Sequence, residues 1–355
     1  MNQKRIGDYG VRLGVFPCGP LDKITDVPGV TVGHATIRDE RHHTGVTVIM
    51  PCEDNMFASK LTAASFVLNG FGKTQGLVQI DELGTLETPI ALTNTLNVGV
   101  VHDALVGYMA ARCAQEGVPM HSLNPVVGEC NDSGMNEIAD RPVTGAHVLA
   151  AIADARSDFE EGDVGAGCGT VCHGLKGGIG SASRVLTIDG QRYTLGVLVQ
   201  SNHGCLEELH VGERAIGREI LEKRRQRASA EPTDRGSIMM ITATDLPVTD
   251  RQLRRIIKRC AAGLARGGSY FGHGSGDVMI GFSTANRVPH GGANRVLTYR
   301  AVNEDALELA FRAIAEATQE AVLNSMCCAH EGKKLSGATV ESLAKYLSSC
   351  CAPKT

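Results

Sequence analysis

Residues 235–245, Arg-Gly-Ser-Ile-Met-Met-Ile-Thr-Ala-Thr-Asp, join two very different parts of the chain. Before them, residues 223–234 contain almost no apolar side chains. After them, residues 238–241 form a short, uncharged apolar run that is typical of a buried strand. Gly236 and Ser237 stand at the boundary. The pattern predicts either an ordinary junction between a loop and a strand, or a chain that is cut between these two residues so that Ser237 becomes a new N-terminus.

The chemistry of the two boundary residues explains how such a cut would work. Glycine takes backbone angles that are closed to other residues, so the peptide bond after Gly236 can be held in an unusual geometry. The Ser237 Oγ could then attack the Gly236 carbonyl, and water would open the resulting ester. The α-amine that is released titrates near pH ~8, so it can act as general base for the hydroxyl of the same residue. A nucleophile of this kind needs no histidine.

Length and composition exclude several classes of protein. The 355 residues could form one large domain or two smaller ones. The formal net charge is −4, so the chain lacks the basic character of a protein that binds nucleic acid or an anionic membrane. Aromatic residues make up only 4% and tryptophan is absent, so platforms for stacking bases or sugars are not expected.

The twelve cysteines do not indicate a disulfide-stabilised secreted protein. The chain is long, and no apolar signal segment follows its first five residues. Cys113 and Cys260 lie in apolar runs, as small core residues do. No Cys-x-x-Cys spacing occurs, so structural zinc is not expected, and no run of about 18 apolar residues could span a membrane. We therefore expect a cytoplasmic protein with no metal and no cofactor.

Apolar periodicity and turn residues predict a chain that mixes strands and helices. Thr144 and Thr249 are expected to cap two of the helices. Predicted strands lie within residues 30–37, 45–51, 90–95, 125–132, 197–204 and 271–284, and predicted helices at 101–113, 144–159, 249–266, 304–324 and 339–347.

Several polar side chains stand where a predicted strand ends. Glu129, Asn131 and Asp132 are candidates for substrate recognition, or else belong to a solvated turn. Asn202 could direct its Nδ2–H at a developing oxyanion, a contribution of roughly 3 kcal/mol in acyl-transfer sites, or it could be a turn residue.

Two glycine-rich stretches have different interpretations. In the second one, Ser275 and Asp277 are two residues apart, so both side chains project to one face of a strand, where they could hydrogen-bond a nucleophile and its amine. In the first, residues 162–183, Thr170 stands where a dinucleotide fingerprint needs glycine, and the Gly-Lys-Ser/Thr order of a P-loop is absent. His42 and His43 could form a metal pair but are expected in a polar hairpin loop.

Seven short motifs are spread along nearly the whole chain: Val-Pro-Gly-Val (27–30), Leu-Thr-Asn-Thr (92–95), Gly-Glu-Cys-Asn-Asp (128–132), Lys-Gly-Gly-Ile-Gly (176–180), Val-Gln-Ser-Asn (199–202), Gly-Ser-Ile (236–238) and Ser-Gly-Asp (275–277). In this order and spacing, they resemble the P1 peptidase family, the L-aminopeptidase/D-esterase and β-aminopeptidase group of self-processing N-terminal-serine hydrolases.

The resemblance implies an α+β fold, a four-layer αββα sandwich that forms a single domain. It also implies one precursor cut into an α part (1–236) and a β part (237–355). Ser237 corresponds to the family nucleophile and Asn202 to its oxyanion donor. Ser275 and Asp277 correspond to a Ser-x-Glu pair that supports the nucleophile, and Glu129 to the carboxylate that holds the free amino group of the substrate. Similar proteins form homo-oligomers, as tetramers of αβ units.

Two departures from the family pattern bear on the site. Asp277 replaces a Glu that is one methylene longer, so its reach to Ser237 could require a water molecule. Asn131 replaces the Tyr of a Glu-x-Tyr-Asp-Gly loop and is followed by Asp-Ser instead of Asp-Gly, which removes a phenolic hydroxyl near the nucleophile. This second change concerns substrate preference more than reaction class.

The sequence therefore predicts a serine aminopeptidase or amidase that hydrolyses small peptides, amino-acid amides or esters through an acyl-enzyme on Ser237. Nucleic acid and membranes are not expected partners. One alternative is an amidase for a different acyl group, such as a pantetheine-like amide, which needs no free amine. Another is an unprocessed, non-catalytic binding protein on the same scaffold. A nucleotide-binding oxidoreductase is the least favoured, since the glycine fingerprint does not hold.

Overall fold

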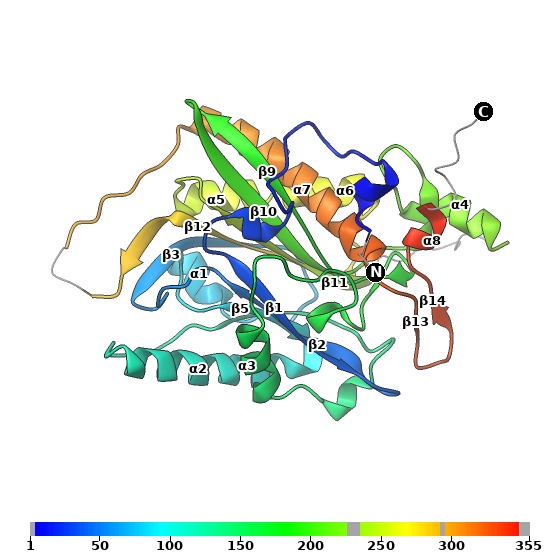
Figure 1. The fold of residues 1–355 in the computed structure, drawn as a ribbon, viewed down its shortest axis with the longest axis horizontal. Coiled ribbons are helices and arrows are strands. Elements are labelled where there is room, and N and C mark those ends of the chain that lie inside the picture. The colour runs from blue at the N-terminus through cyan, green and yellow to red at the C-terminus, as the bar shows by residue number, and fades with distance from the viewer. Residues whose placement is uncertain (1–3, 226–234, 292–294, 348–355) are drawn as a thin grey trace.

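Two β-sheets packed face to face form the centre of the molecule (Figure 1). The computed structural model describes residues 4–225, 235–291 and 295–347. The first sheet has four strands in the order β1 (Thr31–Arg38), β2 (His43–Met50), β5 (Ile90–Asn94) and β6 (Val126–Cys130). The second has six strands in the order β4 (Thr85–Leu86), β3 (Ser59–Gly70), β12 (Gly274–Pro289), β11 (Arg235–Thr244), β10 (Gln191–Asn202) and β9 (Ile179–Ile188).

Helices cover the outer face of each sheet, and this confirms the predicted four-layer αββα sandwich (Figure 1). Helices α2 (Val98–Gln115) and α3 (Gly145–Ala153) pack on the four-stranded sheet, whereas α5 (Asp250–Ile257), α6 (Cys260–Arg266) and α7 (Leu307–Cys327) lie over the six-stranded sheet. The shorter helices are α1 (Leu77–Leu83), α4 (Ile216–Lys223) and α8 (Ala344–Leu347). Two small hairpins are formed by β7 (Val171–Cys172) with β8 (Leu175–Lys176) and by β13 (Gly332–Lys333) with β14 (Thr339–Val340). Short 3₁₀ turns lie at Ile6–Tyr9, Ile24–Asp26, Thr95–Asn97, Ile138–Asp140, Gly165–Gly167, Leu206–Glu208 and Glu304–Ala306.

The apolar run after Ser237 is buried because β11 lies inside the six-stranded sheet. Ile238 and Met240 pack in the core beneath the helices α5, α6 and α7. Met239 and Ile241, on the opposite face, pack in the core between the two sheets. A strand that is covered on both faces is apolar at successive positions, which explains the absence of alternation in this run.

The pairing of β11 fixes the surroundings of its first residues. It runs antiparallel to β10, where Asn202 is the partner of Ser237. It runs parallel to β12, where Gly276 is the partner of Ser237. Parallel neighbours need a crossover connection, which the helices α5 and α6 supply between β11 and β12. Ser237 is therefore held between two long strands at the end of the sheet.

Most predicted elements are confirmed, and three of the predicted helices differ. The helix predicted at 249–266 is capped by Thr249 as expected, but it is divided, because the Arg259 N–H bonds to the carbonyl of Ile256 and tightens the turn between α5 and α6. The helix predicted at 144–159 ends at Ala153, since Arg156 bonds to Val32 of β1 instead.

The prediction of a helix at 339–347 is wrong for its first half. Residues 339 and 340 form strand β14, which pairs with β13, and only Ala344–Leu347 are helical. The pairing partner lies earlier in the chain, so local periodicity could not reveal it. Residues 226–234 of the polar run before Gly236 lie outside the described residues.

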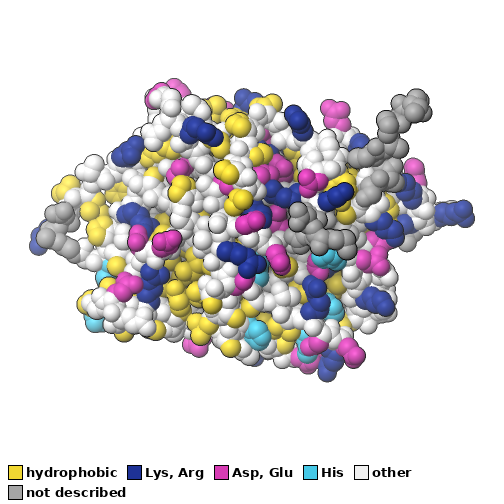
Figure 2. Space-filling view, viewed as in Figure 1, with side chains coloured by type: hydrophobic (Ala, Val, Ile, Leu, Met, Phe, Trp, Pro, Cys, Tyr) yellow, Lys and Arg dark blue, Asp and Glu magenta, His cyan; other side chains and the backbone are white. Residues whose placement is uncertain are grey.

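The face shown in Figure 2 carries charges of both signs, and the described cysteines form no disulfide. Positive and negative side chains are interspersed over the face shown in Figure 2. The ten cysteines within the described ranges are all free thiols. Within these ranges, no helix is both long and apolar enough to cross a membrane.

Candidate active site

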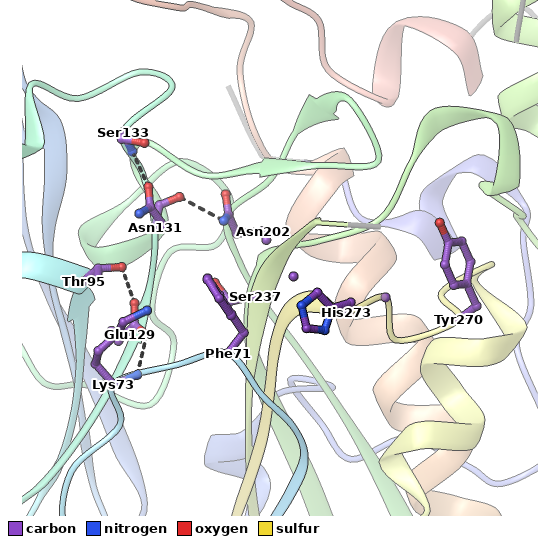
Figure 3. A pocket seen from close by; sticks show the side chains of 13 residues that line it. Phe71, Lys73, Thr95, Glu129, Asn131, Ser133, Asn202, Ser237, Tyr270 and His273 are labelled. Carbon is purple, nitrogen blue, oxygen red and sulfur yellow. Dashed lines mark hydrogen bonds between the residues drawn. The ribbon is translucent and has the colours of Figure 1, made fainter. Parts of the chain in front are cut away.

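A pocket of about 770 Å³ opens where β11 begins, between the two sheets. Four predicted site residues, Ser237, Asn202, Glu129 and Asn131, line it together with Gly236 (Figure 3). They come from β6 and the residue directly after it, from β10 and from β11, which are separate segments of the sequence. The structure therefore brings these predicted residues into one cavity.

Ser237 directs its side chain to the pocket side of β11. Only 3% of the residue is exposed, and no described residue forms a hydrogen bond with its Oγ. Gly236 before it has φ +132°, in a region that residues with a side chain rarely adopt. A Cβ at Gly236 would also lie 1.9 Å from the carbonyl oxygen of Asn202. The boundary glycine is thus required both by its backbone angle and by the space around it.

Asn202 is held at both ends of its side-chain amide. Its Oδ1 accepts a hydrogen bond from the backbone N–H of Val171 at 2.9 Å. Its Nδ2 donates to the backbone carbonyl of Asn131 at 2.9 Å (Figure 3). Because an amide nitrogen carries two hydrogens, one N–H is left after the bond to Asn131. Asn202 therefore belongs to a buried hydrogen-bond network and is not an ordinary turn residue.

Glu129 places a buried carboxylate at the wall of the pocket. The residue is 3% exposed. One carboxylate oxygen accepts from the backbone N–H of Lys73 at 2.9 Å, and the other accepts from the Thr95 hydroxyl (Figure 3). These donors fix the orientation of the carboxylate, which can therefore receive a cationic group without first being ordered.

Ser275 and Asp277 are adjacent as predicted but lie behind the pocket. Both are fully buried, and the Ser275 hydroxyl donates to Asp277 at 2.7 Å. The partner of Ser237 on β12 is Gly276, which lies between them in sequence. Because side chains alternate along a strand, Ser275 and Asp277 face away from the side on which Ser237 Oγ lies. The pair is therefore near the backbone at the start of β11 and not beside the hydroxyl.

The other two polar residues of the 129–132 loop have different surroundings. Asn131 is exposed at the pocket rim, and its Oδ1 accepts from the backbone N–H of Ser133 at 3.0 Å. Asp132 is buried, outside the pocket, and accepts from Asn136 at 2.9 Å. Burial raises the pKa of the Asp132 carboxyl to about 6. Its candidacy for substrate recognition is therefore not supported by its position.

Cys130 adds a thiol that the sequence did not single out as part of the site. It lies between Glu129 and Asn131 on β6, is fully buried, and its Sγ donates to the Gln200 carbonyl at 3.4 Å. Burial, together with the negative charge of Glu129, raises the pKa of this thiol well above its ordinary value. The thiol thus stays protonated and is a poor nucleophile.

Five of the other lining residues have large or polar side chains to which the sequence assigned no role. Phe71, Lys73, Tyr270 and His273 come from the segments next to β3 and β12, and Thr95 follows β5 (Figure 3). Only Thr95 could have been identified, because it is a polar residue at a predicted strand end. By contrast, His42 pairs with Asp39 and Asp140 away from the pocket, and these bonds raise its pKa.

Comparisons with known proteins give close matches over most of the chain. The family model described as "Peptidase family S58" matches residues 22–340. Beta-peptidyl aminopeptidase BapA of Sphingosinicella microcystinivorans is 37% identical over 359 residues, which cover 96% of this chain and 89% of that protein.

Solved structures agree with this finding. The PH0078 protein of Pyrococcus horikoshii OT3 superposes with a TM-score of 0.90 at 43% identity, covering 96% of this chain and 97% of that one. The L-aminopeptidase D-Ala-esterase/amidase of Ochrobactrum anthropi is described as a prototype of the serine aminopeptidases and a new variant of the Ntn hydrolase fold. It superposes with a TM-score of 0.88 at 32% identity, covering 97% of each chain.

Proposed function

Because the chain belongs to peptidase family S58, and is thus an aminopeptidase that hydrolyses peptide bonds, we propose that it is self-processing and that Ser237 is its nucleophile. The observation that carries this proposal is the position of Ser237. Its hydroxyl lies in the pocket beside Asn202. The residue before it, Gly236, has φ +132°, and no other residue could replace this glycine without a clash.

Maturation would proceed through an ester. The Ser237 Oγ attacks the carbonyl carbon of Gly236, the C–N bond between the two residues breaks, and the Ser237 nitrogen takes up the hydroxyl proton. Water then hydrolyses the ester, which leaves a carboxylate on Gly236 and a free α-amine on Ser237. This amine and the hydroxyl belong to the same residue, so the nucleophile carries its own general base.

Turnover would use the same hydroxyl on an external substrate. The α-amine accepts the proton as Oγ attacks the substrate carbonyl, and then gives it to the leaving amine. The second Nδ2–H of Asn202 stabilises the oxyanion, because its other hydrogen is held by the Asn131 carbonyl. Water hydrolyses the acyl-enzyme. Ser275 and Asp277, on the other face of the sheet, would support the α-amine rather than the hydroxyl.

The substrate class follows from charge and size. The oriented carboxylate of Glu129 is suited to the ammonium group at the N-terminus of a peptide or of an amino-acid amide or ester. Phe71 and Tyr270 supply apolar surface in a pocket of about 770 Å³, which has room for a small peptide but not for a folded protein.

The Ser237→Ala variant tests this proposal directly. It should remain one chain of 37.5 kDa in a denaturing intact-mass measurement and show no aminopeptidase activity. The wild-type chain should give two fragments, the smaller of which begins at Ser237. Ser336→Ala, at an exposed position, is the control and should be cut normally. Activity in the uncut Ser237→Ala chain would exclude Ser237 as the nucleophile.

A further inference from the structure

A cysteine and two histidines meet behind the pocket, in a cluster that the proposed reaction does not use. Cys172 ends strand β7, His173 follows it, and His203 comes directly after the last residue of β10. All three are at most 1% exposed. Their ligand atoms lie within 4.8 Å of one another, and Cys172 Sγ is 3.8 Å from His203 Nδ1.

The backbone holds the two halves of this cluster together. The His173 N–H donates to the His203 carbonyl at 2.7 Å. His173 has φ +48°, which is uncommon for a residue with a side chain. Its ring packs against Gly204, where a Cβ would come within 2.4 Å of the imidazole. A glycine and an unusual backbone angle thus place the His173 ring next to Cys172 and His203.

The hydrogen bond of His173 prepares its ring for a cation. Its Nδ1 lies 2.9 Å from the carbonyl oxygen of Cys205, so Nδ1 carries the proton and donates it. The lone pair is then on Nε2. A carbonyl that fixes the tautomer of a histidine in this way is the usual outer contact of a metal-binding imidazole.

The donor set determines which ions would fit. One thiolate and two imidazoles are ligands for zinc and related thiophilic cations, whereas Mg²⁺ and Ca²⁺ prefer oxygen. Tetrahedral zinc, with bonds of about 2.3 Å to sulfur and about 2.1 Å to nitrogen, separates these two ligands by about 3.6 Å. The 3.8 Å between Cys172 and His203 is close to that value.

We propose that Cys172, His173 and His203 form a binding site for a thiophilic transition-metal cation of the zinc class. The absence of a Cys-x-x-Cys motif does not argue against it, because the ligands come from two segments that meet only in the folded chain. Binding displaces the thiol proton of Cys172 to solvent, so the affinity rises with pH.

The site is joined to the pocket through neighbouring residues. Val171, which precedes Cys172, donates to the side chain of Asn202, which precedes His203. Gly236 also packs on this segment, since a Cβ there would lie 3.3 Å from the Cα of His203. A bound cation would therefore restrain both segments that hold Asn202 in place.

Binding can be measured without any reference to peptidase activity. The full chain, dialysed against a chelator, is titrated with Co²⁺ and with Zn²⁺. We expect one ion per chain, a thiolate-to-cobalt charge-transfer band that Zn²⁺ abolishes, and a melting temperature that rises with Zn²⁺ concentration.

The variants assign the ligands. Cys172→Ala should lose the charge-transfer band, and Cys260→Ala, which removes another buried thiol, should keep it. His203→Gln should weaken Co²⁺ binding by more than roughly tenfold, since even the loss of an outer contact has an effect of that size. If Cys172→Ala does not fold, His203→Gln tests the ligand assignment in its place. A wild-type chain without the band, or a band that survives in Cys172→Ala, would overturn the proposal.

Discussion

Replacing Gly236 by alanine should stop or strongly slow the proposed cleavage. The new Cβ would lie 1.9 Å from the Asn202 carbonyl oxygen, although such contacts are essentially never shorter than 3.0 Å. In addition, φ +132° carries backbone strain of about 1–3 kcal/mol for a residue with a side chain. The start of β11 must therefore move away from β10, which separates Ser237 from the residue proposed to stabilise its oxyanion. Since about 1.4 kcal/mol corresponds to a tenfold change in rate, we expect cleavage to slow by about ten- to hundredfold or more.

The assay is a time course of intact mass under denaturing conditions, started as soon as the protein is purified. Gly134→Ala is the matched control, because a Cβ there meets nothing within 4 Å, and it should be cut at the wild-type rate. Circular dichroism and the melting temperature show whether the Gly236→Ala chain is folded. A folded Gly236→Ala chain that is cut as fast as the wild type would refute the argument that this glycine sets the geometry of the scissile bond.

Two further variants test the roles of the carboxylates. Glu129→Gln should lower kcat/KM for substrates with a free amino group by about tenfold or more, because it removes a charged hydrogen bond. The kcat/KM for the N-acetylated analogues should change little. An equal effect on both kinds of substrate would favour an amidase for another acyl group. Asp132→Asn concerns stability. With a pKa of about 6 in the folded chain against an ordinary 3.8, Asp132 binds its proton more tightly when folded, so the free energy of unfolding falls as pH rises from about 4 to 6. The variant should be more stable than the wild type by about 3 kcal/mol at pH 8 and nearly equal at pH 4 in urea unfolding. A gap independent of pH would contradict this.

Local sequence was sufficient to predict the strands that carry the site. Three features could be recognised from residues that are adjacent in the sequence. They are the uncharged run after Ser237, the polar end of the strand at Asn202, and the two-residue spacing of Ser275 and Asp277. Strand periodicity therefore predicted that the last two face the same way, and their hydrogen bond at 2.7 Å confirms this. The family resemblance, rather than periodicity, indicated that these segments belong to one site.

The relative positions of these segments could not be predicted from local pattern. The pairing of Gly276 with Ser237 decides that Ser275 and Asp277 lie on the face opposite to the hydroxyl, and pairing between strands is a non-local property. The Lys73 N–H that orients Glu129 comes from a segment 56 residues earlier. Such contacts depend on how the two sheets are stacked.

The order of strands in the six-stranded sheet has a consequence for how this protein can be made. Strand β12 and all but the first two residues of β11 follow Gly236, and these two strands lie between β3 and β10, which precede it. If the bond after Gly236 is cut as proposed, neither polypeptide can complete the sheet alone. Reassembly must then bring two molecules together, which carries an entropic penalty of at least about 4 kcal/mol that the continuous chain does not have. Recovery of the cut protein from denaturant should therefore fall on dilution, whereas recovery of the Ser237→Ala chain should not. Folding of the continuous chain would have to be complete before it is cut.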